Sequence, residues 1–154
     1  MKIELTKEVV DLINNNDSLK ILTTVDEQNV PHAVIKQSLH VGENGDIQYL
    51  ELFESSLSYK NFTRSLWFDR RVSILVKGAD ELSYQIKGKP VRIIISGPEL
   101  ESSYLKIRAK LGDVDLASIC SIEPEEVVNE TFWVKYAEQE KSRPYFKHLD
   151  RLAK

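Results

Sequence analysis

The sequence has almost none of the residues that staple a small fold or bind metal through sulfur. Cys120 is the one cysteine among 154 residues. A single thiol excludes an internal disulfide and a cysteine-based metal site. The nearby residues Ile119 and Ile122 are apolar, so we expect Cys120 to be a buried core thiol and not a nucleophile.

Long apolar runs are also missing. Charged residues interrupt the opening segment, MKIELTKEVVDLINNN, and no later stretch approaches the ~20 apolar residues that cross a membrane. We therefore expect neither a signal peptide nor a membrane span, and a cytoplasmic location.

Glycine-rich nucleotide loops and excess positive charge are absent too. The six glycines are dispersed, and neither G-x-G-x-x-G nor G-x-x-x-x-G-K occurs. The chain has 21 Lys and Arg against 24 Asp and Glu, a formal net charge of −3. Because non-specific nucleic-acid binding depends on a positive field, we predict no nucleic-acid partner.

Candidate catalytic side chains are scarce. The three histidines, His32, His40 and His148, lack H-x-x-x-H spacing and cysteine partners, so no metal site is predicted. His148 and Asp150 could suggest acid–base chemistry, but a charged amphipathic terminus explains them as simply. We predict no catalytic residue and no metal ligand.

What the sequence does contain is a series of short segments rich in β-branched residues. The expected strands cover residues 19–25, 33–41, 46–53, 71–78, 82–96 and 116–122. Turn sequences at residues 26–29 and at Asn44-Gly45 predict that the first three strands form an antiparallel meander. Gly88 and Pro90 predict a bulge or sharp bend in the fifth strand.

Helical patterns lie between and beside these strands. Apolar residues recur at helical spacing over residues 3–13, and a second helix is expected over residues 98–111, ended by Gly112. Glu123-Pro124 is expected to end the last strand, and a helical or extended tail is expected from about residue 125.

This order of elements lacks the alternation of strand and helix that builds parallel sheets. It predicts a mainly β fold with some α, an antiparallel six-stranded barrel or strongly bent sheet with short flanking helices. The length fits one domain, residues 1–154.

The most polar segment, ESSLSYKNFTRS, follows the third expected strand at residues 54–65. Ser55 or Ser56 is a suitable N-cap, and the first turn of a helix attracts anions. One side of the helix would then carry the polar residues Lys60, Asn61 and Arg64. Another side would carry the apolar residues Tyr59, Phe62 and Leu66. The polar side suits a phosphate, although such serines often only cap a helix and such basic residues are often only solvated.

The second expected strand supplies a polar face next to that helix. Alternation places Lys36 and Ser38 on one face and Gln37 on the other. A flat ligand along the strands, with a phosphate at the helix start, would touch both groups.

This arrangement resembles the FMN-binding split-barrel family related to pyridoxamine 5′-phosphate oxidase. The features that carry the resemblance are the opening helix, the strand series and the residues 49–62, 70–78 and 84–97. The family holds the FMN phosphate with a pattern like S-x-K-x-x-N-L. Here Ser56, Ser58, Asn61 and Phe62 occupy its marked positions, with Ser58 in place of a common lysine and Lys60 two residues on.

The resemblance also implies where the ring of FMN lies and that the protein is a homodimer. It implies contacts to the flavin ring from the second strand, where Lys36, Gln37 and Ser38 occupy the matching segment. It implies flavin sites at the subunit interface, which Gln85 of a neighbouring copy could reach. The aromatic residues Trp67, Phe68 and Trp133 could line that interface or pack in the core.

The function expected from the resemblance is FMN-dependent oxidoreduction, with the electron chemistry on the flavin and NAD(P)H as a candidate electron donor. The alternative is a non-enzymatic module on the same fold that stores or senses flavin or holds haem. A third possibility is the deazaflavin coenzyme F420 in place of FMN.

Overall fold

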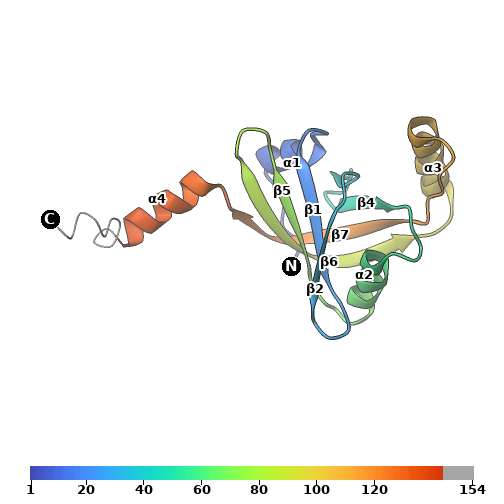
Figure 1. The fold of residues 1–154 in the computed structure, drawn as a ribbon, viewed down its shortest axis with the longest axis horizontal. Coiled ribbons are helices and arrows are strands. Elements are labelled where there is room, and N and C mark those ends of the chain that lie inside the picture. The colour runs from blue at the N-terminus through green and yellow to red at the C-terminus, as the bar shows by residue number, and fades with distance from the viewer. Residues whose placement is uncertain (144–154) are drawn as a thin grey trace.

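Seven strands form one antiparallel sheet in the structure, a computed structural model that describes residues 1–143. The strands are β1 Leu19–Val25, β2 Pro31–Ile35, β3 His40–Val41, β4 Ile47–Glu51, β5 Val72–Lys77, β6 Ser83–Ile94 and β7 Ser118–Asn129. The helices are α1 Lys7–Asn14, α2 Leu57–Trp67, α3 Pro98–Leu111 and α4 Phe132–Ser142. Figure 1 shows a strongly bent sheet with α1 and α2 close to it. The predicted mainly β, barrel-like fold with short helices is confirmed.

The order of strands across the sheet is β2-β1-β5-β6-β7-β4-β3. β2 and β3 follow each other in the chain but lie at opposite edges of the sheet, so residues 36–39 join the two edges. We call these four residues the seam. The predicted single strand over residues 33–41 is wrong, because a turn breaks it: the N–H of Leu39 donates to the carbonyl of Lys36 at 3.1 Å. The break explains why seven strands form where six were predicted.

The predicted three-strand meander is only partly confirmed, because β4 pairs with the end of the predicted second strand, which is β3, and not with β2. β2 pairs with β1 as expected, but β4 pairs with β3 and with β7 instead of β2. The turn sequences were located correctly: Asn29 and Gly45 have left-handed backbone angles, with φ of 63° and 82°. They do not determine which strand becomes the next neighbour in the sheet.

A bulge bends the long strands β6 and β7, as Gly88 and Pro90 predicted. The register between the two strands shifts between Lys87 and Gly88 and again between Pro90 and Arg92. A Cβ on Gly88 would lie 2.6 Å from Cγ2 of Ile122, so only glycine fits there.

β7 is longer than predicted, because it does not end at Glu123-Pro124. Pro124 lies opposite Gly88 at the irregular part of the ladder, where a missing N–H costs little. Its carbonyl accepts a hydrogen bond from the N–H of Ile3 at 2.9 Å. Residues 125–129, predicted as tail, therefore continue the strand.

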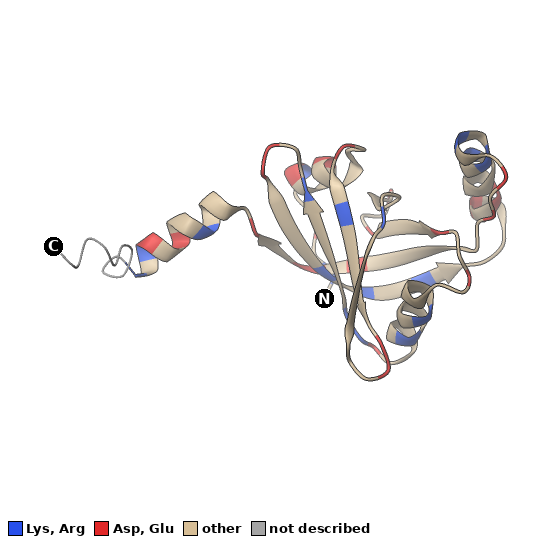
Figure 2. Ribbon diagram, in the orientation of Figure 1, with Lys and Arg blue, Asp and Glu red and all other residues tan. Residues whose placement is uncertain are grey.

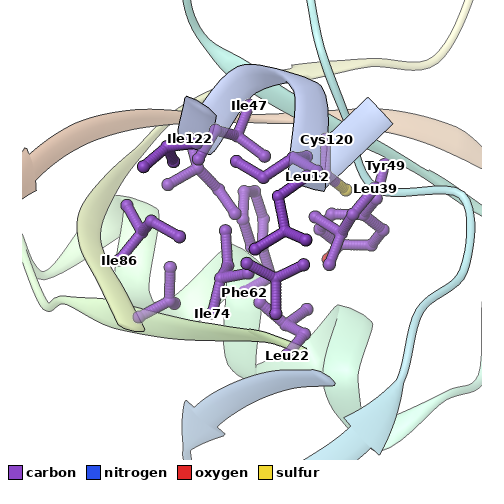
Figure 3. Packing of buried hydrophobic residues seen from close by; sticks show 14 residues of the cluster. Leu12, Leu22, Leu39, Ile47, Tyr49, Phe62, Ile74, Ile86, Cys120 and Ile122 are labelled. Atoms are coloured by element: carbon purple, nitrogen blue, oxygen red, sulfur yellow. The ribbon is translucent and has the colours of Figure 1, made fainter. Parts of the chain in front are cut away.

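The core lies inside the bend of the sheet. α1 begins after Thr6, whose hydroxyl caps it, and buries Val9, Leu12 and Ile13. Figure 3 shows side chains from five strands, the seam, α1 and α2 meeting in this cluster. Cys120 is buried among them, which confirms the expected core thiol.

α3 and α4 stand away from the sheet, and neither helix buries a residue. α3 agrees with the predicted helix over residues 98–111 and ends at Gly112, with a φ of 85°. α4 lies at the far ends of β6 and β7 in Figure 1 and carries a cluster of aromatic rings: Phe132, Trp133 and Tyr136. Within residues 1–143, no helix combines the length and apolarity needed to cross a membrane.

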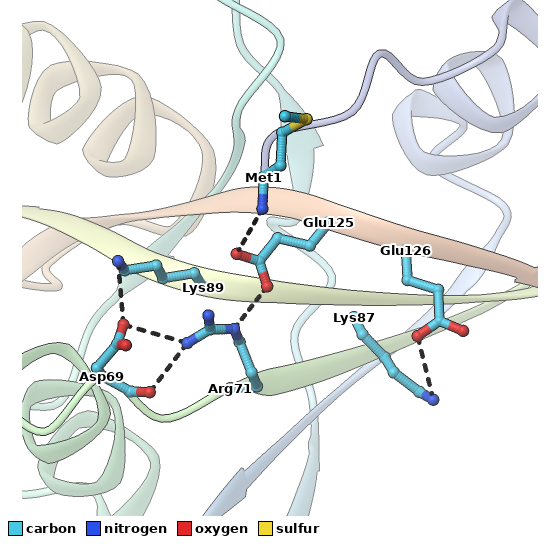
Figure 4. Close-up of polar contacts among 7 residues, drawn as sticks. All are labelled: Met1, Asp69, Arg71, Lys87, Lys89, Glu125 and Glu126. Atoms are coloured by element: carbon cyan, nitrogen blue, oxygen red, sulfur yellow. Dashed lines mark hydrogen bonds and ion pairs between the residues drawn. The ribbon is translucent and has the colours of Figure 1, made fainter.

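A chain of surface ion pairs ties the N-terminus to β5, β6 and β7. The ammonium of Met1 lies 3.5 Å from Glu125, which also pairs with Arg71. Asp69 joins Arg71 at 3.2 Å and Lys89 at 3.0 Å (Figure 4). These pairs are largely exposed, so each adds little stability by itself.

Candidate functional site

The start of α2 has the serine cap that the sequence predicted. β4 ends at Glu51, and Ser56 is the N-cap of α2: its hydroxyl accepts a hydrogen bond from the N–H of Tyr59 at 3.0 Å. A capped helix still leaves first-turn N–H groups without partners in the helix. Ser55, immediately before the cap, is exposed. Hydroxyl and N–H donors therefore gather where β4 passes into α2.

The inner face of α2 holds two of the predicted site residues. Ser58 and Asn61 are buried together with Phe62, and the amide of Asn61 donates to the hydroxyl of Thr24 on β1 at 3.1 Å. The prediction that Asn61 shares a side with Lys60 and Arg64 is wrong, because Asn61 lies on the stripe that packs against the sheet. Contact of Ser58 and Asn61 with a ligand stays a prediction.

The outer face of α2 lines a hollow of about 540 Å³, which we call the α2 hollow. Its lining residues are Glu54, Tyr59, Lys60, Thr63, Arg64, Trp67 and Phe68. Arg64 pairs with Glu27 at 3.1 Å and lies over the ring of Phe68. Lys60 is exposed, and within residues 1–143 no carboxylate pairs with it. Lys60 can therefore neutralise an incoming anion.

A second hollow, of about 600 Å³, lies between the seam, the end of β4 and α3. We call it the lysine hollow. Its residues are Asn14, Asn16, Lys20, Ile35, Lys36, Gln37, Ser38, Leu39, His40, Leu50, Glu51, Leu52, Phe53, Lys106, Ile107, Lys110 and Leu111. Figure 2 shows basic positions (blue) on α3, on β1 and after β2, the elements around this hollow.

Lys36 lines the lysine hollow, but its charge is already paired. Its ammonium lies 2.8 Å from Oε2 of Glu51, and 1% of the Glu51 side chain is exposed. The ammonium also lies 5.4 Å from the centre of the Tyr49 ring. The pair joins the seam to the end of β4, where no strand ladder connects them.

Gln37 and Ser38 also line the lysine hollow and also hold the seam in place. The side chain of Gln37 accepts from the N–H of Lys20 at 3.0 Å and donates to the carbonyl of Ser18 at 2.9 Å. The hydroxyl of Ser38 accepts from the N–H of Leu50 at 3.0 Å. The structure thus brings the three predicted seam residues together, with most of their polar groups engaged inside the protein.

Lys20 is a residue of the lysine hollow that was not predicted. It is 2% exposed, and its ammonium donates to the carbonyls of Gln37 at 3.3 Å and Leu39 at 3.1 Å. Burial, followed by the nearby charge of Lys110, lowers the pKa of Lys20. Alternation in β1 could have indicated it, because Lys20 shares the inward face with Leu22.

Gln85 lies apart from both hollows. It is on β6, opposite Leu75 of β5 and Val128 of β7. Its predicted contact with the ligand of a neighbouring copy stays a prediction. Trp67 and Phe68 are exposed at the α2 hollow, and Trp133 is exposed on α4, so none of the three packs in the core.

The buried thiol of Cys120 is unsuited to nucleophilic chemistry. Burial raises its pKa, so the thiolate is disfavoured. Tyr49 lies beside it with a hydroxyl that has no hydrogen-bond partner in the described chain, and burial raises its pKa as well. Within residues 1–143, no three His, Cys, Asp or Glu side chains gather as metal ligands do. His148 and Asp150 lie outside the described residues.

Comparison with known proteins gives matches to solved structures. No protein-family model matches the chain, and no curated protein matches it. HupZ of Group A Streptococcus matches with a TM-score of 0.66 at 21% sequence identity, over 83% of this chain and 95% of that chain. An FMN-binding protein from Syntrophomonas wolfei matches with a TM-score of 0.65 at 13% identity, over 80% of this chain and 84% of that chain.

A third match is a protein from Lactobacillus delbrueckii that is provisionally assigned as a pyridoxamine 5′-phosphate oxidase. It has a TM-score of 0.60 at 24% identity, over 83% of this chain and 99% of that chain. At these identities the matches establish the fold and leave activity open. The chain therefore has the FMN-binding split-barrel fold of pyridoxamine 5′-phosphate oxidase-like proteins.

Proposed function

We propose that this protein binds FMN, with the phosphate at the start of α2 and the ring along the seam. The observation that carries the proposal is the corner between β4 and α2. There Ser55, the Ser56 cap and the unpaired ammonium of Lys60 surround the first turn of a helix. The solved structures that share the fold, one of them described as FMN-binding, support the same ligand class.

The residues at this corner fit a phosphate group. Ser56 uses an oxygen lone pair for the cap, so its hydroxyl proton remains available to donate. Ser55 adds a second hydroxyl, and Lys60, one helical turn after the Ser56 cap, adds a positive charge. The chain therefore offers both donors and a counter-charge to an anion at this place.

The ring of the flavin would lie in the lysine hollow, whose walls are partly apolar. Phe53 connects the two halves of the proposed site, because it lines the lysine hollow and its neighbour Glu54 lines the α2 hollow. Lys36, Gln37 and Ser38 also line the lysine hollow. Bound FMN would supply one- or two-electron transfer, and the residues of the chain would bind and orient it.

We also propose that the protein is a homodimer. Large apolar side chains are exposed on α2 and on α4, and α4 buries no residue in the single chain. A second copy that covers these surfaces would remove apolar area from water. Sedimentation equilibrium tests this point, and a monomer at all concentrations would contradict it.

The test of flavin binding starts with the visible spectrum of the purified protein and with mass spectrometry of any released cofactor. Titration of the cofactor-free protein with FMN then compares Lys60→Gln with Lys141→Gln, which removes one charge from α4. We expect Lys60→Gln to weaken FMN binding by about tenfold and Lys141→Gln to leave it unchanged. No FMN binding, or equal effects of the two changes, would refute the proposed site.

The proposed activity is flavin-dependent electron transfer, with NADH or NADPH as the donor to test. Loss of the flavin absorbance on adding either nucleotide under anaerobic conditions would support an oxidoreductase. Bound flavin that neither nucleotide reduces would favour a storage or sensing role. Coenzyme F420 or haem in the released cofactor would replace FMN in the proposal.

A further inference from the structure

The lysine hollow concentrates positive charge in a protein whose formal net charge is −3. Four lysines line it, and among the described lining residues Glu51 is the one carboxylate. Glu51 is committed to Lys36 at 2.8 Å. Lys20, Lys106 and Lys110 have no carboxylate partner within residues 1–143, so the hollow has an uncompensated positive charge.

Lys20 supplies the buried part of this charge. Two of the three N–H groups of its ammonium donate to main-chain carbonyls of the seam, and the third has no described acceptor. A lysine that is 2% exposed and lacks a counter-ion carries a charge that is costly to bury. The lowered pKa of Lys20, caused by burial and then by Lys110, reflects that cost. An anion bound in the hollow would pair with Lys20 and offset the cost of burying its charge.

The walls of the hollow point to a ligand with an apolar body. Ile35, Phe53 and Leu111 line it and are 63%, 69% and 55% exposed. Ile107 lies on the α3 side, between Lys106 and Lys110 in the sequence. A ligand that placed its charge on the lysines would place its body against these side chains and cover them.

We propose that the α3 side of the lysine hollow binds a small organic anion, a carboxylate or phosphate ester with an apolar body. Lys20 and Lys110 would contact the anionic group, and Phe53 and Leu111 would pack on the body. The role of this anion as the substrate beside the flavin rests on the proposed function, whereas its binding does not.

The test uses phenyl phosphate and benzoate as probes and benzyl alcohol as the neutral match. Binding to the flavin-free protein is measured by titration calorimetry and located by amide chemical-shift changes. The variants are Lys106→Gln and Lys110→Gln, which lie on a helix that buries no residue and should not unfold the protein. Lys141→Gln on α4 removes the same charge far from the hollow and is the control.

We expect at least one of the two anions to bind at least about tenfold more tightly than benzyl alcohol, with shift changes in the seam and α3. Lys110→Gln should weaken that binding by about fivefold or more, and Lys141→Gln should not change it. Preference for phenyl phosphate or for benzoate would identify the anionic group of the ligand. Equal binding of benzyl alcohol, or equal effects of Lys110→Gln and Lys141→Gln, would overturn the inference.

A titration with FMN separates this inference from the proposed function. If the aryl anion binds in the hollow and FMN does not bind at all, the anion site stands and the flavin proposal fails. If FMN binds and displaces the aryl anion from Lys110, the two ligands compete for the hollow, and the role of the anion as a substrate beside the flavin fails. Both ligands bound together would support both proposals.

Discussion

The buried ion pair between Lys36 and Glu51 allows a quantitative prediction about stability. At 2.8 Å and an effective dielectric constant of about 20, the attraction is roughly 6 kcal/mol, which desolvation of the two charges largely cancels. Removing one partner leaves the other charge in the protein with the desolvation cost and without the attraction. Lys36→Met should therefore destabilise the protein by about 3 to 5 kcal/mol. The charge left behind is that of Glu51, whose side chain is 1% exposed.

The double variant Lys36→Met, Glu51→Leu should recover most of this loss, because neither charge is then buried alone. Urea unfolding of the flavin-free protein measures each free energy by linear extrapolation.

The matched control is Lys87→Met, which breaks the ion pair between Lys87 and Glu126. The side chains of this pair are 48% and 56% exposed, respectively. An exposed pair of this kind is worth at most about 1 kcal/mol. If Lys36→Met costs no more than Lys87→Met, the pair between the seam and β4 is not buried in solution as the structure has it.

Three further predictions concern the core, the bulge and the surface ion pairs. Tyr49→Phe should leave stability unchanged or raise it by up to about 1 kcal/mol, because the buried hydroxyl has no partner among the described residues; a clear loss in urea unfolding would show that it has one. Gly88→Ala should cost about 1 to 3 kcal/mol, because the added Cβ meets the facing strand, and an unchanged unfolding midpoint would contradict this packing. Hydrogen bonds from Lys89 and then Arg71 lower the pKa of Asp69, so its contribution is present above the ordinary pKa of an aspartate and is lost as pH falls through the lowered value. Asp69→Asn should therefore lower the melting temperature at neutral pH and leave it unchanged in strong acid, whereas a pH-independent difference would refute the linkage.

Most strands and the start of α2 were predictable, because their signals are local. β-branched residues identify β1 and β5, and the serines at the end of the third predicted strand identified the cap at Ser56. Gly88 indicated the bulge. Each of these features depends on residues a few positions apart.

The seam was not predictable from the same signals. The residues from Ile35 to His40 include no glycine, proline, asparagine or aspartate that would mark a turn. Hydrogen bonds from main-chain N–H groups of β1 and β4 to the side chains of Gln37 and Ser38 nevertheless hold them in one. That arrangement depends on Ser38 meeting Leu50, a contact between distant parts of the chain. The pairing of β4 with β7 instead of β2 likewise depends on residues far apart in the sequence.

The lysine hollow was only partly predictable. Lys36, Gln37 and Ser38 were identified, and Lys20 could have been identified from alternation in β1. The lysines of α3 could not, because the sequence does not say toward which side of a bent sheet a helix between β6 and β7 returns.

The seam has a consequence for how mutations in this protein are interpreted. The side chains of Lys36, Gln37 and Ser38 join two sheet edges that no ladder connects, and the same side chains line a hollow. An alanine scan across them would therefore mix weaker ligand affinity with a loosened barrel. Lys106 and Lys110 avoid this confusion, because α3 buries nothing, so changes there report on recognition without disturbing folding.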